Sequence, residues 1–145
     1  MEGMIQFNFD RASLGRFNTQ CNVAISKLQA GTKRALKEAC EDIMKDSLAQ
    51  VPRETQTLAS SIFYEIYGSS GNFSAEVGYG KGGGINPRTG KIARYYMLAV
   101  HENLNAWHLI GKAKFLEDPV AAYARDRFPQ TVLKHARQSL SSMTT

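Results

Sequence analysis

The sequence contains few cysteines and prolines and no long apolar run. Of its 145 residues, two are Cys and four are Pro. Cys21 and Cys40 both fall in one predicted helix, whose rise of about 1.5 Å per residue separates them by about 28 Å and excludes a disulfide between them. The longest apolar run, Tyr95 to Val100, is far shorter than the roughly 20 residues of a transmembrane helix. The first residues contain no basic region followed by an apolar stretch, so we expect a protein that matures in a cytosol and does not contact membranes.

Acidic residues are fewer than basic ones. The chain has 18 Lys and Arg against 13 Asp and Glu, which gives a net charge of +5 and a pI near 9.3. This excess favours contact with polyanions. The basic residues are spread along the whole chain, however, whereas a dedicated nucleic-acid-binding domain concentrates them on one stripe. We predict one domain over residues 1–145, with an N-terminal extension or strand at 1–12 and a frayed tail at 142–145.

Apolar residues at helical spacing predict a long helix from Ser13 to Gln50. The following residues share one face, about 120° wide on a helical wheel: Phe17, Cys21, Ala24, Ile25, Leu28, Thr32, Ala35, Leu36, Ala39 and Ile43. Asp10 and Ser13 are candidate N-caps, Pro52 stops the helix, and Gly31 marks a bend or a close contact. Such a helix is about 50 Å long, more than a domain of this size covers by itself. We therefore expect part of its apolar face to contact another chain.

Alternating apolar residues predict strands in two parts of the chain. Met4 to Phe9 alternates and predicts a short strand before the helix. Ser60–Tyr67 and Phe73–Tyr79 alternate on either side of a turn sequence at Gly68–Asn72, which predicts a β-hairpin. One face of this hairpin would carry Ile62, Tyr64, Ile66, Phe73, Ala75, Val77 and Tyr79. The segment Gly80–Lys91 is too rich in glycine for a regular element, and we predict a mobile basic loop.

The C-terminal part of the chain predicts helices interrupted by irregular connections. The apolar block Tyr95–Val100 is compatible with a helix or a buried strand, which periodicity does not separate. Asn103–Lys114 reads as an irregular connection. Asp118 and Pro119 predict a helix start, with Asp118 as N-cap and the proline at the first helical position. Pro129 predicts a kink or a split in that helix. The chain is thus predicted to be an α+β protein, with a long N-terminal helix packed on a small antiparallel sheet and a kinked or split C-terminal helix.

The sequence contains no complete catalytic motif. Gly90-Lys91 lacks both the earlier glycine and the following Ser or Thr of a phosphate-binding P-loop. His101-Glu102 resembles the start of a zinc-protease helix, but Asn105 occupies the position of the second histidine. We therefore predict that the protein is not an enzyme and uses neither a cofactor nor a metal.

Two stretches together resemble one protein family. In the first, the matching residues are Pro52, Thr55, Leu58, Ser61 and Ile62, while Gln56 stands where the family usually has glycine. The second comprises Tyr96, Val100-His101-Glu102 and then Lys114-Phe115-Leu116 before Asp118-Pro119, with Asn103-Leu104 in place of the family's usual Gly-Thr. In these motifs and their order, residues 15 to 140 resemble the tail-completion proteins of long-tailed bacteriophages, also called head–tail joining or minor capsid proteins.

The resemblance implies a structural role without catalytic residues. By this resemblance the subunits form a six- or twelve-fold ring at the neck of the virion, between the portal-side connector and the tail tube or terminator. The ring surrounds the path of the DNA, which it contacts without sequence specificity. The protein would be made in the cytoplasm of the bacterial host.

Two irregular segments, Gly80–Lys91 and Asn103–Lys114, are candidate docking loops for such a ring. The residues that we expect at contacts between subunits are Lys81, Arg88, Lys91, Tyr95, Tyr96 and Trp107. By contrast, we expect Phe115 or Leu116 to be buried within the subunit, against Ile62, Ile66 or Val77. The alternative function is a small basic nucleic-acid-binding protein that uses the Gly80–Lys91 loop and the tyrosines.

Overall fold

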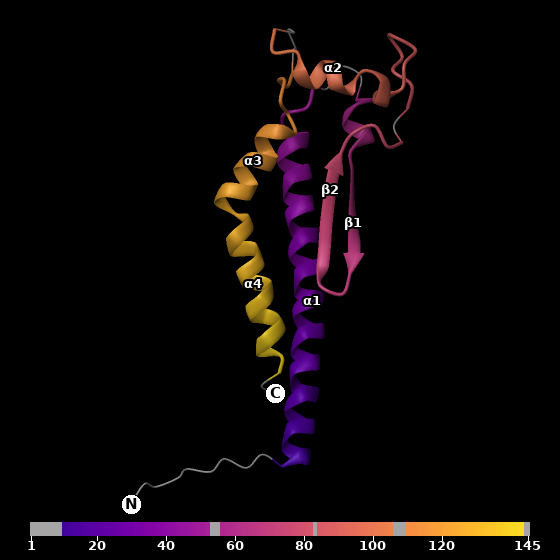
Figure 1. Cartoon of the computed structure of the whole chain (residues 1–145). Helices are drawn as coiled ribbons and strands as arrows, with labels where there is room; N and C mark the ends of the chain where they lie inside the picture. The colour runs from indigo at the N-terminus through magenta and orange to yellow at the C-terminus, as the bar shows by residue number, and fades with distance from the viewer. Residues whose placement is uncertain (1–9, 53–55, 83, 106–109, 144–145) are drawn as a thin grey trace, which may run out of the picture.

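The computed structural model describes residues 10–52, 56–82, 84–105 and 110–143. Its main element is helix α1, Arg11–Leu48, which runs along the length of the molecule (Figure 1). The β-hairpin lies on one side of α1, and helices α3 and α4 lie on the other (Figure 1). The predicted α+β architecture is therefore confirmed. No helix among the described residues is both long enough and apolar enough to cross a membrane.

Helix α1 begins at a side-chain cap. The carboxylate of Asp10 accepts hydrogen bonds from the backbone N–H of Ser13 at 2.8 Å and from the Ser13 hydroxyl at 2.7 Å. Both bonds lower the pKa of the Asp10 carboxyl, and the bond from the Ser13 hydroxyl has the larger effect. Of the two candidate caps Asp10 is the one used, so the helix starts two residues earlier than predicted. The strand predicted at Met4–Phe9 lies outside the described residues.

The predicted hairpin is formed by β1, Phe63–Ser69, and β2, Asn72–Gly78, which pair antiparallel. The register places Tyr64 opposite Val77 and Ile66 opposite Ala75, so the alternating residues share one face as predicted. This face is turned toward α1, where Val77 packs against the cluster formed by Ala39, Ile43 and Tyr123.

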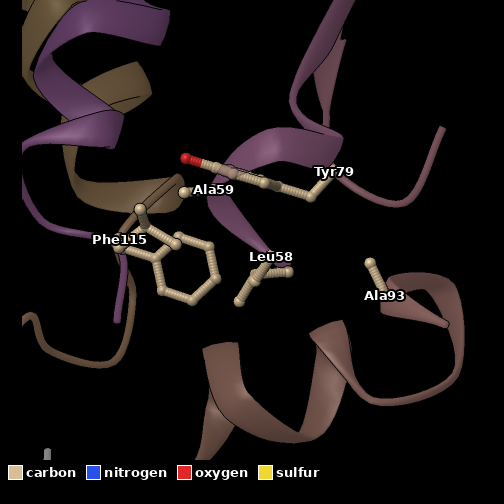
Figure 2. Packing of buried hydrophobic residues seen from close by; sticks show 6 residues of the cluster. Leu58, Ala59, Tyr79, Ala93 and Phe115 are labelled. Carbon is tan, nitrogen blue, oxygen red and sulfur yellow. The ribbon is translucent and has the colours of Figure 1, made fainter. Parts of the chain in front are cut away.

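A buried cluster joins the end of α1 to the segments that follow it (Figure 2). It consists of Val51, Leu58, Ala59, Tyr79, Ala93 and Phe115. Phe115 is 1% exposed, and its ring packs edge-on against Tyr79 at 5.2 Å between centroids. The buried hydroxyl of Ser47 donates to the Phe115 carbonyl at 2.6 Å and lies 2.8 Å from the Tyr79 hydroxyl. Ile62 packs on this cluster, so the expected burial of Phe115 is confirmed.

The segment before the C-terminal helices contains helix α2, Met97–Glu102, preceded by a 3₁₀ turn at Ala93–Tyr95. Of the two alternatives for the apolar block at 95–100, the helix is therefore correct. In the described part of 103–114 there is no helix or strand, as predicted. Here Lys112 N–H donates to the Gln50 carbonyl at 2.9 Å, and Lys114 N–H donates to the His101 carbonyl at 2.8 Å.

The C-terminal helix is split into α3, Glu117–Asp126, and α4, Phe128–Ser141. Pro129 lies in the first turn of α4, so the predicted split is confirmed. The prediction that Asp118 is an N-cap is wrong, because α3 begins at Glu117 and includes Asp118 and Pro119 in its first turn. The turn is already closed there, since Asp118 N–H donates to the Lys114 carbonyl at 3.0 Å. Pro119 has no N–H to donate to the Phe115 carbonyl, which accepts from the Ser47 hydroxyl instead.

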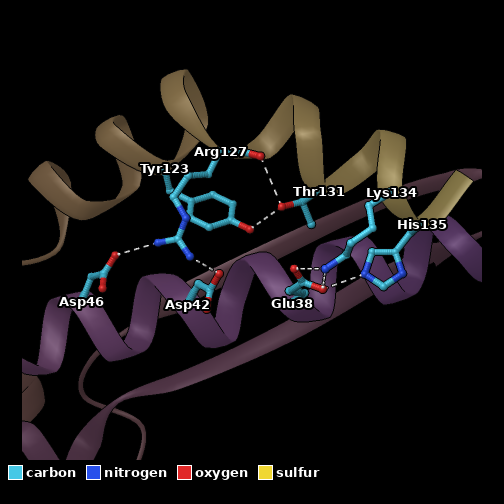
Figure 3. Close-up of polar contacts among 8 residues, drawn as sticks. All are labelled: Glu38, Asp42, Asp46, Tyr123, Arg127, Thr131, Lys134 and His135. Carbon is cyan, nitrogen blue, oxygen red and sulfur yellow. Dashed lines mark hydrogen bonds and ion pairs between the residues drawn. The ribbon is translucent and has the colours of Figure 1, made fainter. Parts of the chain in front are cut away.

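Helix α4 packs antiparallel to α1 through a series of polar contacts (Figure 3). Arg127 binds both Asp42 and Asp46, while Lys134 and His135 bind Glu38. Hydrogen bonds from Lys134 and His135 lower the pKa of Glu38, and the bond from Lys134 has the larger effect. These contacts fix which residues of α1 are covered by α4.

Candidate assembly surfaces

The apolar face of α1 continues beyond the part that the rest of the subunit covers. Between Gly31 and Ser47 this face is buried under the hairpin, α3 and α4. Nearer the N-terminus the same face carries Leu14 and Phe17, which are 50% and 66% exposed. Half-buried residues connect these two to the covered part: Cys21, Ala24 and Leu28. We call Leu14 to Leu28 on this side of α1 the open apolar face.

Both neighbours of α1 end at the same level of the helix. Helix α4 ends at Ser141, and the next residue, Ser142, accepts a hydrogen bond through its carbonyl from Lys27 Nζ at 2.7 Å. The turn of the hairpin at Gly71 lies beside the side chain of Gln29. Figure 1 shows α1 projecting beyond both elements. The open apolar face is therefore exposed because its neighbours are too short to reach it.

A second exposed apolar surface lies on α4. Val132, Leu133, Leu140 and Met143 are between 36% and 48% exposed. The side of α4 that contacts α1 instead carries the buried small residues Thr131 and Ser139. The subunit thus presents two different apolar surfaces on two different helices. Such a pair allows head-to-tail contacts, in which one surface of each copy binds the other surface of the next copy.

The predicted docking residues that the structure describes lie at the other end of the molecule, around α2 and the loop before it (Figure 1). Tyr95 is 72% exposed, and Lys81, Arg88 and Lys91 are also exposed. Lys81 pairs with Glu65 and lies 5.1 Å from the centroid of the Phe63 ring. Tyr96 instead packs against the buried cluster of Phe115, and its hydroxyl oxygen is buried without a partner among the described residues. Trp107 lies outside the described residues.

The Gly80–Lys91 segment contains a short turn organised by Asn86. The backbone N–H of Asn86 donates to the Lys91 carbonyl at 2.8 Å, and the Asn86 carbonyl accepts from Gly90 N–H at 2.8 Å. The Asn86 side chain accepts from Arg88 N–H at 2.9 Å, and Ile85 and Ile92 form an isolated β-bridge. The described part of this segment contains no helix or strand, as predicted, although the isolated bridge and the side-chain bond of Asn86 close a local turn in it.

A cluster of charged residues connects α2 to the start of α3. Lys114 Nζ bonds the carboxylates of both Glu102 and Glu117. These bonds lower the pKa of the Glu102 carboxyl and raise the pKa of Lys114. His101 Nδ1 lies 2.7 Å from the Glu102 carboxylate, and its Nε2 accepts from Glu117 N–H at 3.3 Å. These bonds hold α3 against α2. His101, Glu102 and Glu117 each also bring one possible metal-ligand atom within 4.8 Å of the others.

The cluster borders a cavity of about 240 Å³ between α2 and the buried cluster. Tyr79, Met97, Leu98, Phe115 and Leu116 supply most of its lining. The lining is apolar apart from His101 and Glu102, whose polar atoms bond within the subunit. The described residues around it present no nucleophile paired with a base.

Comparisons with models of protein families, with curated proteins and with solved structures found no match to this chain. The surfaces described above therefore rest on the chain's own residues. The predicted docking set did not include Leu14 or the apolar residues of α4. Leu14 extends the predicted stripe by one turn before Phe17, which the spacing could have revealed. The positions at which α4 and the hairpin end show which part of that stripe is left open.

Proposed function

We propose that this chain is a structural virion protein that forms a ring at the neck of a long-tailed bacteriophage. In this proposal the ring joins the DNA-filled head, at the portal-side connector, to the tail tube or terminator, and the DNA passes through its lumen. The resemblance of residues 15 to 140 to tail-completion proteins supplies this particular role. It supplies the six- or twelve-fold order as well.

The open apolar face of α1 is the observation that carries the proposal. A Phe that is 66% exposed and a Leu that is 50% exposed lie one turn apart on a helix whose remaining apolar face is buried. Burying such side chains stabilises an interface by about 1.5–3 kcal/mol each. A contact made by this face and the apolar side of α4 in a neighbouring copy joins two different surfaces and closes as a ring if the rotation fits.

A pair of single substitutions on α1 tests the assembly. Phe17→Asp places a charge in the open apolar face, whereas Asn22→Asp adds the same charge on the opposite side of the same helix. We expect Phe17→Asp to weaken self-association at least about tenfold, as the loss of one buried aromatic ring implies, and Asn22→Asp to leave it nearly unchanged. Sedimentation velocity over a concentration series measures the effect. Equal behaviour of the two variants would contradict a contact through this face.

The position in the virion needs a separate experiment. Electron microscopy of the purified protein, alone and mixed with the connector and tail components, is expected to show rings at the junction. Deleting part of the Gly80–Lys91 loop should leave folding intact, because this loop buries little, but should impair the joining of heads to tails. An absence of copies from the neck would refute the proposal, whereas a loop variant that unfolds would show that the loop contains part of the core.

The rival proposal is a small basic nucleic-acid-binding protein. The two differ in what salt does to the complex. A nucleic-acid complex loses affinity steeply with increasing salt because counterions are released on binding, whereas a ring held by apolar contacts stays assembled. Sedimentation of the protein at low and high salt, with and without DNA, therefore separates the two.

A further inference from the structure

Charge is distributed unevenly between two parts of the molecule. From Arg11 to Lys37 the chain contains no acidic residue, and the same holds from Arg127 to Thr145. The basic residues of these two segments are Arg11, Arg16, Lys27, Lys33, Arg34, Lys37, Arg127, Lys134 and Arg137. The segment between them, residues 38–126, contains eleven Asp and Glu against nine Lys and Arg. The excess positive charge of the chain is therefore located in two segments that lie far apart in the sequence.

The fold places these two segments side by side. Lys27 Nζ donates to the carbonyl of Ser142 at 2.7 Å, and Arg34 donates to the Ser139 hydroxyl at 2.8 Å. The C-terminal half of α4 thus lies against the acid-free part of α1, as Figure 1 shows. Although the basic residues are spread along the sequence, the tertiary structure collects many of them at one end of the molecule.

Most of these cations have no carboxylate partner among the described residues. Arg11, Arg16, Lys27, Lys33, Arg34 and Arg137 form no ion pair there. Where they do interact, the partner is neutral: Arg16 bonds the Ser13 hydroxyl at 3.1 Å, and Lys33 lies over the Phe73 ring. Their charge is left for an external partner, and we call these six residues the basic surface.

The acidic residues of a second copy cannot readily supply that partner. Nine carboxylates already pair with a basic side chain of their own subunit: Glu38, Glu41, Asp42, Asp46, Glu65, Glu102, Glu117, Asp118 and Asp126. Among the described residues only Asp10 and Glu76 have no such pair. Apart from Asp10 and Glu76, a described carboxylate that paired with the basic surface of another copy would compete with an ion pair inside its own subunit. An external polyanion, which brings its own charge, fits better.

The spacing of the cations fits a duplex more than a single strand. Arg16, Lys27 and Arg34 are separated by eleven and seven residues, close to three and two helical turns, so they follow one edge of α1 over about 27 Å. Double-stranded DNA presents about one phosphate charge per 1.7 Å of its axis. Neither α1 nor α4 contains a Tyr or Trp. The exposed aromatic residue of α1, Phe17, belongs to the open apolar face and stands alone, whereas single-strand binders stack successive bases on several aromatic side chains.

We propose that the basic surface binds the phosphate backbone of double-stranded DNA without sequence specificity. The inference deepens the proposed function by naming the surface that contacts the DNA, and it rests on that function only for the origin of the DNA. Three residues of the basic surface, Arg16, Lys27 and Arg34, lie on a different side of α1 from Leu14 and Phe17 of the open apolar face. A subunit can therefore contact a neighbour and the DNA at the same time.

Fluorescence anisotropy with a labelled 30-base-pair duplex, using the full chain, tests the proposal. The test variant combines Arg11→Gln, Arg16→Gln and Arg137→Gln, which break no ion pair and leave the bonds of Lys27 and Arg34 to α4 intact. The control removes three cations at the other end of the molecule, through Arg88→Gln, Lys91→Gln and Arg94→Gln. Both variants therefore have the same net charge. Circular dichroism checks that each is folded.

We expect the test variant to bind the duplex about tenfold or more weakly at 100 mM salt, and the control to bind within about threefold of the original protein. The slope of log K against log salt should fall by about 2–3 in the test variant, because each phosphate contact contributes about 0.9. Equal losses in the two variants, no loss, or tighter binding of a single strand of the same length would overturn the proposal. So would a test variant that keeps its DNA affinity but loses self-association, since the basic surface would then bind protein.

Electron microscopy of the same variants separates this inference from the proposed ring. Rings that persist in the test variant, together with the expected loss of duplex affinity, support the basic surface and leave the ring proposal standing. A chain that forms no ring but binds the duplex through the basic surface refutes the ring alone.

Discussion

Replacing Gly31 with alanine should destabilise the protein, although alanine is the better helix former. Gly31 is buried in α1 where α4 crosses it, and a Cβ at this position would lie 2.4 Å from Ser139 Oγ and 3.1 Å from the His135 carbonyl oxygen. Ser139 cannot turn away freely, because its hydroxyl donates to the His135 carbonyl at 2.8 Å and accepts from Arg34 at 2.8 Å. Overpacking of this kind costs about 1–3 kcal/mol, and each lost hydrogen bond about 1 kcal/mol more.

These costs exceed the gain of about 1 kcal/mol that alanine brings in a helix interior. We therefore expect the Gly31→Ala substitution to lower the free energy of unfolding by about 2 kcal/mol and the Tm by about 4–8 °C. Gly15 supplies the matched control, because it lies in the same helix and a Cβ there would have no neighbour within 4 Å. Gly15→Ala should raise the free energy of unfolding by up to about 1 kcal/mol.

Thermal and urea unfolding followed by circular dichroism measures both variants, at a concentration where sedimentation shows one species. Adding Ser139→Ala to Gly31→Ala removes the closest clash and should restore part of the lost stability. If Gly31→Ala is as stable as Gly15→Ala, then α4 does not cross α1 at this point, and the helix packing described above is wrong.

Two further predictions concern the core and the acid sensitivity of the fold. Phe115→Ala should lower the free energy of unfolding by about 3–5 kcal/mol, because the ring is 1% exposed. We expect Trp107→Ala to cost much less stability and to weaken assembly. Thermal melts and assembly assays on both variants would show the reverse order if core and docking surface were exchanged. Glu38 has a pKa below its ordinary value of 4.5 because Lys134 and His135 bond it, so its contribution to stability is present above that value and is lost as the pH falls through the lower pKa of the folded state. Glu38→Gln should therefore flatten the fall in Tm on acidification below about pH 5, and an unchanged pH profile would contradict the bonding of Glu38.

The elements that the sequence predicted correctly depend on local signals. Helix α1 follows from apolar residues at helical spacing and from the cap at Asp10, whose bonds span three residues. The hairpin follows from alternation around a turn in which Ser70 and Gly71 have positive φ values. The split before α4 follows from Pro129, which lacks an N–H. Each of these causes acts within one or two turns of the chain, so each can be read without knowing the fold.

The predictions that the sequence left open or missed depend on contacts between distant residues. The apolar block at 95–100 forms a 3₁₀ turn and the start of α2 rather than a strand, and in the described part of the chain it packs on the buried cluster around Phe115 instead of pairing with the hairpin. The start of α3 is set by Lys114, whose carbonyl accepts from Asp118 and whose ammonium group bonds two carboxylates. Local propensity placed this start about two residues too late, because it contains no information about α2.

The sequence also determined that α1 is amphipathic and too long to be covered within one subunit, since periodicity and length are properties of the segment itself. The tertiary structure decided which part of that face stays open, because this depends on where α4 and the hairpin turn end, beside Lys27 and Gln29. It also decided that two acid-free segments about a hundred residues apart form one basic surface. Charge along a sequence adds up without regard to position, whereas the field at a surface depends on which charges the packing of α4 on α1 brings together.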